Sequence, residues 1–230
     1  MGQEEEAFDR VDATFPIVAI GASAGGVEAL TAFFKRIPAH SRAAFVVITH
    51  LAAHRASLMP EILSRCTDMP VNGAKDGMAL APAHVYVIPP DAILTIADGH
   101  VALSPRGGEH NLIDLCLVSL AGTAANRAVA IILSGTGSDG ALGLKAVRAA
   151  GGFTLAQGRE GTTPGHNEMP DAAIATGFVD CVLPIDDLAD RLATYIDGFA
   201  ITPLGDHDAA RRDLEEVKHE LFVLLQQRVG

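Results

Sequence analysis

Residues 16–36 read PIVAIGASAGGVEALTAFFKR, and this stretch decides the fold. An apolar run, Pro16–Ile20, ends at Gly21, and a helical pattern follows from Val27 to Arg36. Continuous apolar runs that end in glycine and lead into a helix are typical of buried parallel strands. The stretch therefore predicts a strand, a tight turn and a helix.

The same unit recurs along the chain. Strand-like runs are followed by helix-like stretches twice more, first at Ala44–Thr49 with Ser57–Arg65 and then at Ala128–Leu133 with Asp139–Ala150. Two later strand-like runs, Phe153–Ala156 and Phe178–Leu183, flank a predicted short helix over Asp171–Thr176. Strands that alternate with helices predict a parallel sheet covered on both faces.

An antiparallel hairpin is predicted between these units. The runs Ala92–Ala97 and His100–Leu103 are joined by Asp98-Gly99, a pair that strongly favours a two-residue turn. The predicted fold class is thus α/β, with a doubly wound, mainly parallel sheet, helices on both faces and the hairpin as an antiparallel decoration.

Composition indicates a globular, cytoplasmic protein. With 49% hydrophobic and 20% charged residues among 230, the chain can bury a substantial core. No apolar run approaches the roughly 18 residues that span a bilayer. The acidic N-terminal stretch lacks the basic start and apolar segment of a secretory signal. We expect neither membrane insertion nor secretion.

Charge and cysteine content narrow the partners and cofactors. A net charge of −11 disfavours a sequence-independent nucleic-acid binder, because phosphate affinity comes from clustered Lys and Arg. The three cysteines are widely spaced, which fits neither a disulfide framework nor a zinc knuckle. We expect a polar or protein substrate and no cofactor.

The predicted organisation is an acidic leader over 1–14, an α/β domain over 15–200 and an amphipathic helix over 206–230. In that last segment apolar residues recur at steps of three and four, at Leu214, Val217, Leu221 and Leu224. Two heptads are too few to establish a coiled coil. The helix either docks on its own domain or serves as a dimer contact or a linker to a neighbouring module.

The first candidate for chemistry is the glycine-rich turn around Ser23. A serine on a sharp strand-to-helix turn is typical of a nucleophile elbow. Such a turn is also typical of loops that hold cofactor phosphates. Against that alternative, the turn has no Lys of a Walker loop, and the second strand ends in His50 rather than in the acidic residue of a dinucleotide site.

His50 and Asp139 follow the second strand and the apolar strand that ends at Leu133. An imidazole at the end of the second strand is placed to act as general base for Ser23, and a carboxylate can fix its tautomer. Structural alternatives remain at this point: a core histidine, a metal pair of His50 with His54, or Asp139 as the N-cap of the next helix.

Together these residues resemble the CheB family, the protein-glutamate methylesterases and glutaminases of bacterial chemotaxis. The resemblance covers roughly 15–199, and its more specific motifs are LSGTGSDG at 133–140 and Met169-Pro170 before ATGFVD at 175–180. It implies a catalytic triad of Ser23, His50 and Asp139 that acts on glutamyl methyl esters or glutamine amides of chemoreceptor helices.

The resemblance also implies which residues bind the oxyanion. The sequence departs from the family pattern in two respects, at position 24 and in its regulation. The resemblance places an oxyanion donor at the backbone N–H of Thr136, with Gly135, Gly137 and Ala24 around the oxyanion and the substrate. Relatives often have Thr at position 24, and the loss of one such donor typically lowers the rate by about 10²- to 10³-fold.

The second departure concerns regulation. Typical members carry a receiver domain before the esterase, for which 1–14 leave no room, so a methyltransferase hybrid is one expected context. A catalytically weak or inactive interaction module and a nucleotide-binding α/β domain are the competing functions.

Overall fold

The computed structural model describes residues 15–50, 57–108, 110–159 and 165–199, together with Glu215 and His219. The predicted leader lies outside these ranges, as does all of the predicted C-terminal helix except those two helical residues.

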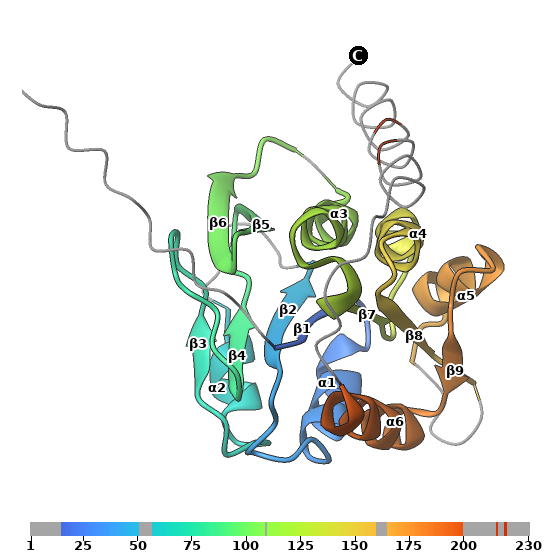
Figure 1. The fold of residues 1–230 in the computed structure, drawn as a ribbon, viewed down its shortest axis with the longest axis horizontal. Coiled ribbons are helices and arrows are strands. Elements are labelled where there is room, and N and C mark those ends of the chain that lie inside the picture. Colours follow the sequence, from blue (N-terminus) through green and yellow to red (C-terminus); the bar gives the residue numbers. More distant parts are fainter. Residues whose placement is uncertain are drawn as a thin grey trace, which may run out of the picture.

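A seven-stranded sheet in the order β3-β4-β2-β1-β7-β8-β9 forms the centre of the fold, and every strand pair in it is parallel (Figure 1). Its strands are β1 (Ile17–Ala22), β2 (Ala44–Thr49), β3 (Val71–Gly73), β4 (His84–Val87), β7 (Ala128–Ile132), β8 (Phe153–Gln157) and β9 (Cys181–Leu183). Every residue of β1, β2, β7 and β8 is buried. The doubly wound α/β prediction is confirmed.

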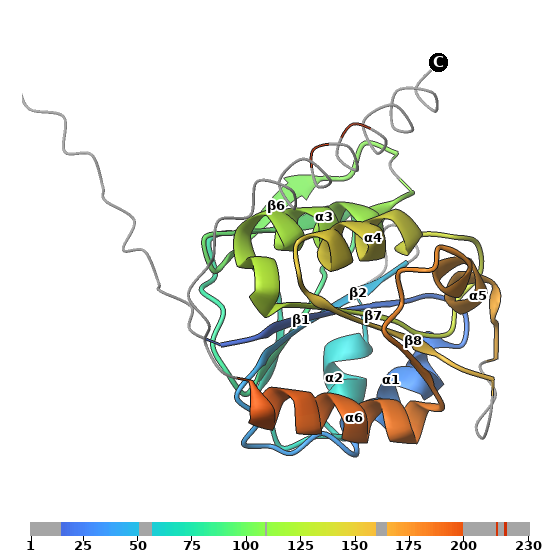
Figure 2. The same cartoon turned by 45° about the vertical axis from the view of Figure 1, so that its right-hand side comes forward.

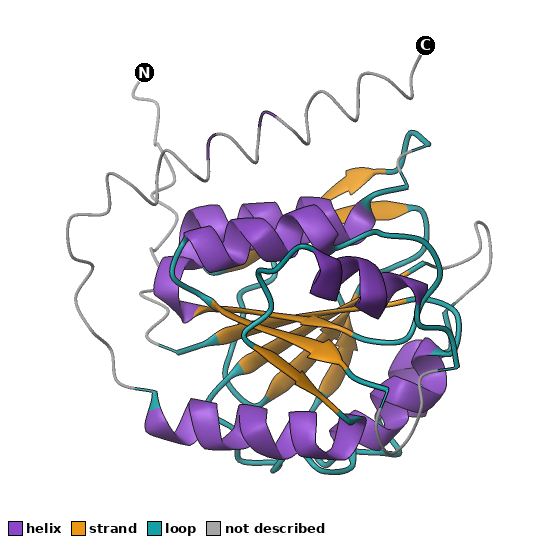
Figure 3. Ribbon diagram, turned by 90° about the vertical axis from the view of Figure 1, so that its right-hand side faces the viewer, coloured by secondary structure: helices purple, strands orange, loops and turns teal. Residues whose placement is uncertain are grey.

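Helices cover both faces of this sheet (Figures 2 and 3). One apolar core contains buried residues of α3, α4 and α5, and the other contains those of α1, α2 and α6. Their bounds are α1 Gly26–Phe34, α2 Met59–Leu63, α3 Leu112–Ala124, α4 Ala141–Ala149, α5 Glu168–Ala175 and α6 Ile185–Gly198. A short 3-10 turn, Ala125–Arg127, follows α3.

The predicted hairpin is present as β5 (Ala92–Ala97) and β6 (His100–Pro105). It forms a two-stranded sheet of its own beside α3 and is not hydrogen-bonded into the seven-stranded sheet (Figure 1). Asp98 and Gly99 both have positive φ, 47° and 77°, as the primed two-residue turn requires. The hairpin packs along α3 on the side away from α4 (Figure 1), and most residues of that helix are buried.

The close approach of α3 and α4 depends on Gly143. A Cβ there would lie 2.5 Å from the Leu117 Cβ and 3.1 Å from the Asp114 Cα. We expect Gly143→Ala to lower the free energy of unfolding by about 1–3 kcal/mol, because the helices must move apart. Urea unfolding of the purified variant measures this change.

The matched control is Gly122→Ala, in the last turns of α3. A Cβ at Gly122 meets nothing within 4 Å, so the better helix propensity of Ala should raise the free energy of unfolding by about 0.5–1 kcal/mol. Equal effects of the two substitutions would contradict the packing argument.

Candidate active site

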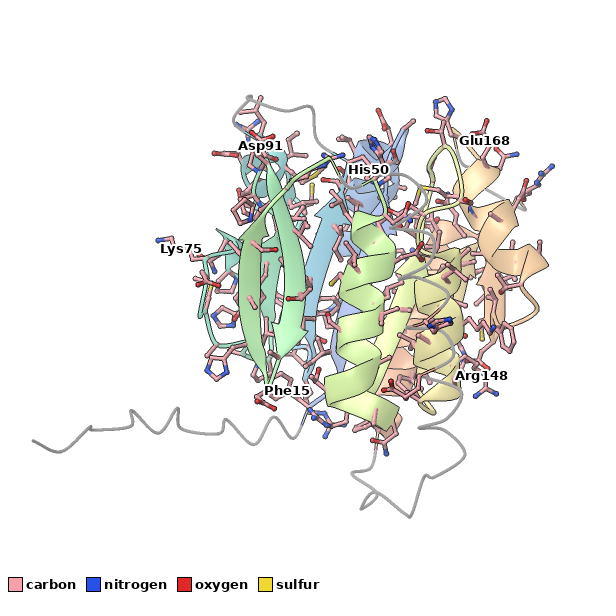
Figure 4. All side chains as sticks on the ribbon, turned by 90° about the horizontal axis from the view of Figure 1, so that it is seen from above. Phe15, His50, Lys75, Asp91, Arg148 and Glu168 are labelled. Atoms are coloured by element: carbon pink, nitrogen blue, oxygen red, sulfur yellow. The ribbon has the colours of Figure 1, made fainter. Side chains whose placement is uncertain are left out.

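Three loops meet at the carboxyl edge of the sheet. They follow the neighbouring strands β2, β1 and β7 and carry His50, Ser23 and Asp139 respectively. The chain winds away from β1 in both directions, toward β2 on one side and β7 on the other. Ligand sites of open α/β sheets lie at such a switch point. Figure 4 shows His50 at this end of the molecule and Phe15, before β1, at the other.

Ser23 lies on the predicted strand-to-helix turn. β1 ends at Ala22 and α1 begins at Gly26, with Gly25 at the N-cap in the left-handed conformation, φ 73°. A Cβ at Gly25 would lie 2.7 Å from the Ser134 Oγ, and one at Gly26 would lie 2.8 Å from the Ala22 Cβ. Glycine is therefore required at both positions for the chain to turn sharply and present Ser23.

His50 bridges the other two predicted residues. Its Nδ1 lies 3.3 Å from the Ser23 Oγ, and its Nε2 lies 2.8 Å from the Asp139 Oδ2. A carboxylate only accepts hydrogen bonds, so we assign the proton of the neutral ring to Nε2. The lone pair of Nδ1 then faces the Ser23 hydroxyl, which is the arrangement a general base needs.

Asp139 is buried and accepts three hydrogen bonds. Besides His50, the backbone N–H of Ile113 donates to Oδ2 at 3.0 Å and that of Asp114 donates to Oδ1 at 2.9 Å. These N–H groups belong to the first turn of α3, where the helix dipole favours an anion. The alternative role of Asp139 as the N-cap of the following helix is wrong: the N-cap of α4 is Gly140, and Asp139 caps α3 instead.

The loop after β7 contacts the turn of Ser23, whose N–H donates to the Ser134 carbonyl. The N–H of Gly135 donates to the His166 carbonyl, and the N–H of Gly137 donates to the Glu168 Oε2. Within the described ranges, no hydrogen bond uses the N–H of Thr136 or that of Ala24. The N–H groups of the two glycines thus fix the loop. Those of Thr136 and Ala24 have no acceptor within the described ranges and are available to a ligand.

Ser134 ties this loop to the turn of Ser23. Its Oγ lies 2.9 Å from the carbonyl oxygen of Ala24 and accepts from the N–H of His166 at 3.0 Å, and its own carbonyl accepts from the N–H of Ser23 at 2.9 Å. Both sides of the site are therefore set by one buried serine.

Three residues of the site were not among those predicted: Asp114, Ser134 and Glu168. Ser134 lies in the LSGTGSDG motif, which could have identified it, and Glu168 adjoins the Met169-Pro170 motif. Figure 4 shows Glu168 at the same end of the molecule as His50. Asp114 belongs to α3, a helix that the sequence pattern did not predict.

The predicted metal alternative paired His50 with His54, and His54 lies outside the described residues. Both ring nitrogens of His50 already face Ser23 and Asp139. Among the described residues, no group of three His, Cys, Asp or Glu side chains is arranged to hold a metal ion. No helix in the described part of the chain is long and apolar enough to cross a membrane.

Comparisons with known proteins point to one family. The model of the CheB methylesterase family matches residues 18–192. A protein-glutamate methylesterase/protein-glutamine glutaminase of Burkholderia lata is 38% identical over 191 residues, which are 78% of this chain and 54% of that protein. One from Anaeromyxobacter dehalogenans is 38% identical over 185 residues with the same coverage. The chain spans about half the length of these curated relatives.

Two further similarities concern a solved structure and a larger protein. The crystal structure of the Thermotoga maritima CheB methylesterase catalytic domain superposes with a TM-score of 0.72 at 28% identity, over 79% of this chain and 99% of that one. An uncharacterized 104.1 kDa protein of Rhodobacter capsulatus is 43% identical over 141 residues, or 60% of this chain and 14% of that protein.

Proposed function

The chain belongs to the CheB methylesterase family, and on that premise we propose that it hydrolyses glutamyl methyl esters and glutamine amides on chemoreceptor helices. The observation that carries the proposal is the continuous contact from Ser23 through His50 to Asp139, with distances of 3.3 and 2.8 Å. A serine hydroxyl becomes a useful nucleophile only when a base removes its proton during attack.

The reaction begins at the side-chain carbonyl of the substrate. The Ser23 Oγ attacks the carbonyl carbon while its proton passes to the His50 Nδ1, and Asp139 stabilises the imidazolium that forms. The carbonyl oxygen becomes an oxyanion, which the N–H groups of Thr136 and Ala24 stabilise. The positive end of α1, directly behind Ser23, adds to this stabilisation.

An acyl-enzyme then forms and is hydrolysed. The tetrahedral intermediate collapses, the His50 Nδ1 returns its proton, and methanol leaves from an ester or ammonia from an amide. Water attacks the glutamyl ester on Ser23, with His50 again acting as base. The products are a glutamate side chain and free serine, so the cycle requires no cofactor.

The partners follow from the same reaction. The substrate is a methyl-accepting chemoreceptor or a similar signalling helix, which lies in the cytoplasm. The ester that this reaction removes must be made by a methyltransferase. We therefore propose a methyltransferase module as a partner of this chain.

Released methanol from a methylated receptor fragment tests the proposal. We expect one methanol to be released for each methyl group that the receptor fragment loses. We also expect mass spectrometry to detect conversion of receptor glutamines to glutamates. A receptor fragment whose methylation sites are replaced by Ala serves as the control substrate. A chain that is folded, yet releases neither methanol nor ammonia from the intact fragment, would favour an interaction module over an enzyme.

A further inference from the structure

The N-termini of α3 and α4 exchange their caps. Neither helix receives a side-chain cap from its own N-cap residue, Asn111 for α3 and Gly140 for α4. The residue before Gly140 is Asp139, and its carboxylate accepts from the first turn of α3. The third residue of α3 is Asp114, and its Oδ1 accepts the N–H of Gly143 in the first turn of α4 at 2.8 Å.

This exchange brings two carboxyl groups together in the interior. Asp114 is 4% exposed and Asp139 is 8% exposed. The backbone N–H of Asp114 donates to the Asp139 Oδ1 at 2.9 Å, so the two residues are neighbours, and burial and the charge of Asp139 raise the pKa of Asp114. Two like charges on neighbouring groups that are shielded from water repel strongly.

The two carboxyl groups are both buried, but they differ in the hydrogen bonds that they accept. Burial, and next the charge of Asp139, raise the pKa of Asp114 to about 7 from 3.8, against the opposing effect of the Gly143 and Gly140 N–H groups. Asp139 accepts three N–H groups, including the one from His50, and hydrogen bonds to the charged form favour it. Asp114 is therefore the member of the pair whose neutral form the surroundings favour.

The other titratable groups near Asp114 do not reverse the rise in its pKa. His50 lies beyond Asp139 on the far side of the pair. The Cys116 thiol of α3 has its pKa raised to about 12, by burial first and then by the charge of Asp139, so it stays neutral. The charged neighbour that acts on Asp114 is Asp139.

We propose that Asp114 is a positioning residue for Asp139: in its neutral form its O–H donates to the Asp139 carboxylate and holds that carboxylate against His50. Ionisation of Asp114 removes this donor and places a second negative charge beside Asp139. The hydrogen bond to His50 then loosens. This inference rests on the proposed function for its consequence in catalysis, but the contact itself can be tested without a receptor.

The substitution Asp114→Asn imitates the neutral acid. An amide can donate to Asp139 and accept from Gly143, as the protonated carboxyl does, and it does not ionise. Asp114→Ala removes both bonds. Asp98→Asn, in the hairpin turn where Asn-Gly is equally favoured, is the matched control.

The experiment measures the rate at which a fluorophosphonate labels the active-site serine, from about pH 5 to about pH 9, on both sides of the Asp114 pKa of about 7. Below that pKa we expect Asp114→Asn to label within about threefold of the parent chain. Above it the parent should fall behind Asp114→Asn by about tenfold. Asp114→Ala should label more slowly than Asp114→Asn by about tenfold or more at every pH, as expected for the loss of a hydrogen bond to a charged group.

Thermal unfolding of the same samples gives a second readout. Because the pKa of Asp114 is raised in the folded chain, its contribution to stability is complete below about 3.8 and is lost as pH rises through about 7. The parent should therefore lose stability across this window. Asp114→Asn should lack that loss.

Three results would overturn the proposal: an Asp114→Asn chain that labels as slowly as Asp114→Ala, one that follows the parent at every pH, or one that does not fold. Labelling and unfolding as expected, with no methanol from the receptor fragment, would leave the positioning role standing and reject the proposed substrate instead.

Discussion

Ser23→Ala should lower the rate of methanol release by on the order of 10⁶-fold, to the level that binding and the oxyanion donors alone sustain. The reason is that the variant keeps His50 and Asp139 but has no atom that can form the acyl-enzyme. The fold should be unaffected, since the bonds that fix the turn come from the backbone of Ser23, whose N–H donates to Ser134 and whose carbonyl accepts from Gly26.

Ser64→Ala is the control for this prediction. Ser64 is exposed at the end of α2 and donates to the carbonyl of Glu61, so its loss should leave the rate unchanged. Both variants should match the parent in circular dichroism and urea unfolding. A Ser23→Ala chain that demethylates receptor at the parent rate would remove Ser23 from the mechanism.

Asp139→Asn should lower kcat by about 10⁴-fold with little change in KM. The carboxylate faces three N–H donors, those of His50, Ile113 and Asp114. An amide offers one oxygen, and its NH₂ must face at least one of these donors.

If the amide NH₂ takes the Oδ2 side, it faces His50 and the N–H of Ile113. A tautomer change of His50 then relieves the first of these contacts, and the N–H of Ile113 is left without its acceptor. The ring then accepts from the amide at Nε2 and carries its proton on Nδ1, toward Ser23, where it cannot take the serine proton. NMR of the imidazole nitrogens distinguishes the two tautomers. Asp98→Asn, on an exposed turn, is again the control, and an Asp139→Asn chain within about tenfold of the parent would contradict the role of the carboxylate.

The central strands, and the contact among Ser23, His50 and Asp139, could be predicted because one physical rule covers both. Fully buried parallel strands read as continuous apolar runs, and β2 was predicted with the bounds that the structure shows. The carboxyl ends of such strands share one edge of the sheet. Residues that follow β1, β2 and β7 could therefore be expected to meet, although they are up to 116 positions apart, from Ser23 to Asp139.

Some helices and strands were not predicted from the sequence, and the reasons differ. α3 reads LIDLCLVSLAGTA, and nine of its thirteen residues are buried, because the sheet, the hairpin and α4 surround it. Such a helix has no polar face, so the 3.6-residue spacing of apolar residues does not stand out in its sequence. α6 does carry an apolar stripe at Ile185, Leu188, Leu192 and Ile196, which was a usable signal. β3 has three residues, too few for a pattern. β9, Cys181–Leu183, was predicted but is shorter than the strand-like run Phe178–Leu183.

The missed helix also explains the part of the site that sequence patterns did not predict. Asp114 reaches Asp139 only because α3 packs closely on α4, and that approach depends on Gly143. Nothing in the spacing of Asp114 and Asp139 indicates the contact. The hydrogen bonds that Asp139 accepts from the N–H groups of Ile113 and Asp114 likewise depend on the position of α3 in the fold.

Mass spectrometry of the chain after treatment with a fluorophosphonate tests the central claim most directly, since the probe reports the nucleophile and its base without a receptor. We predict a single adduct on the peptide that contains Ser23 in the parent chain, and its loss in His50→Ala. An unmodified Ser23, or an adduct that forms equally fast without His50, would contradict the account.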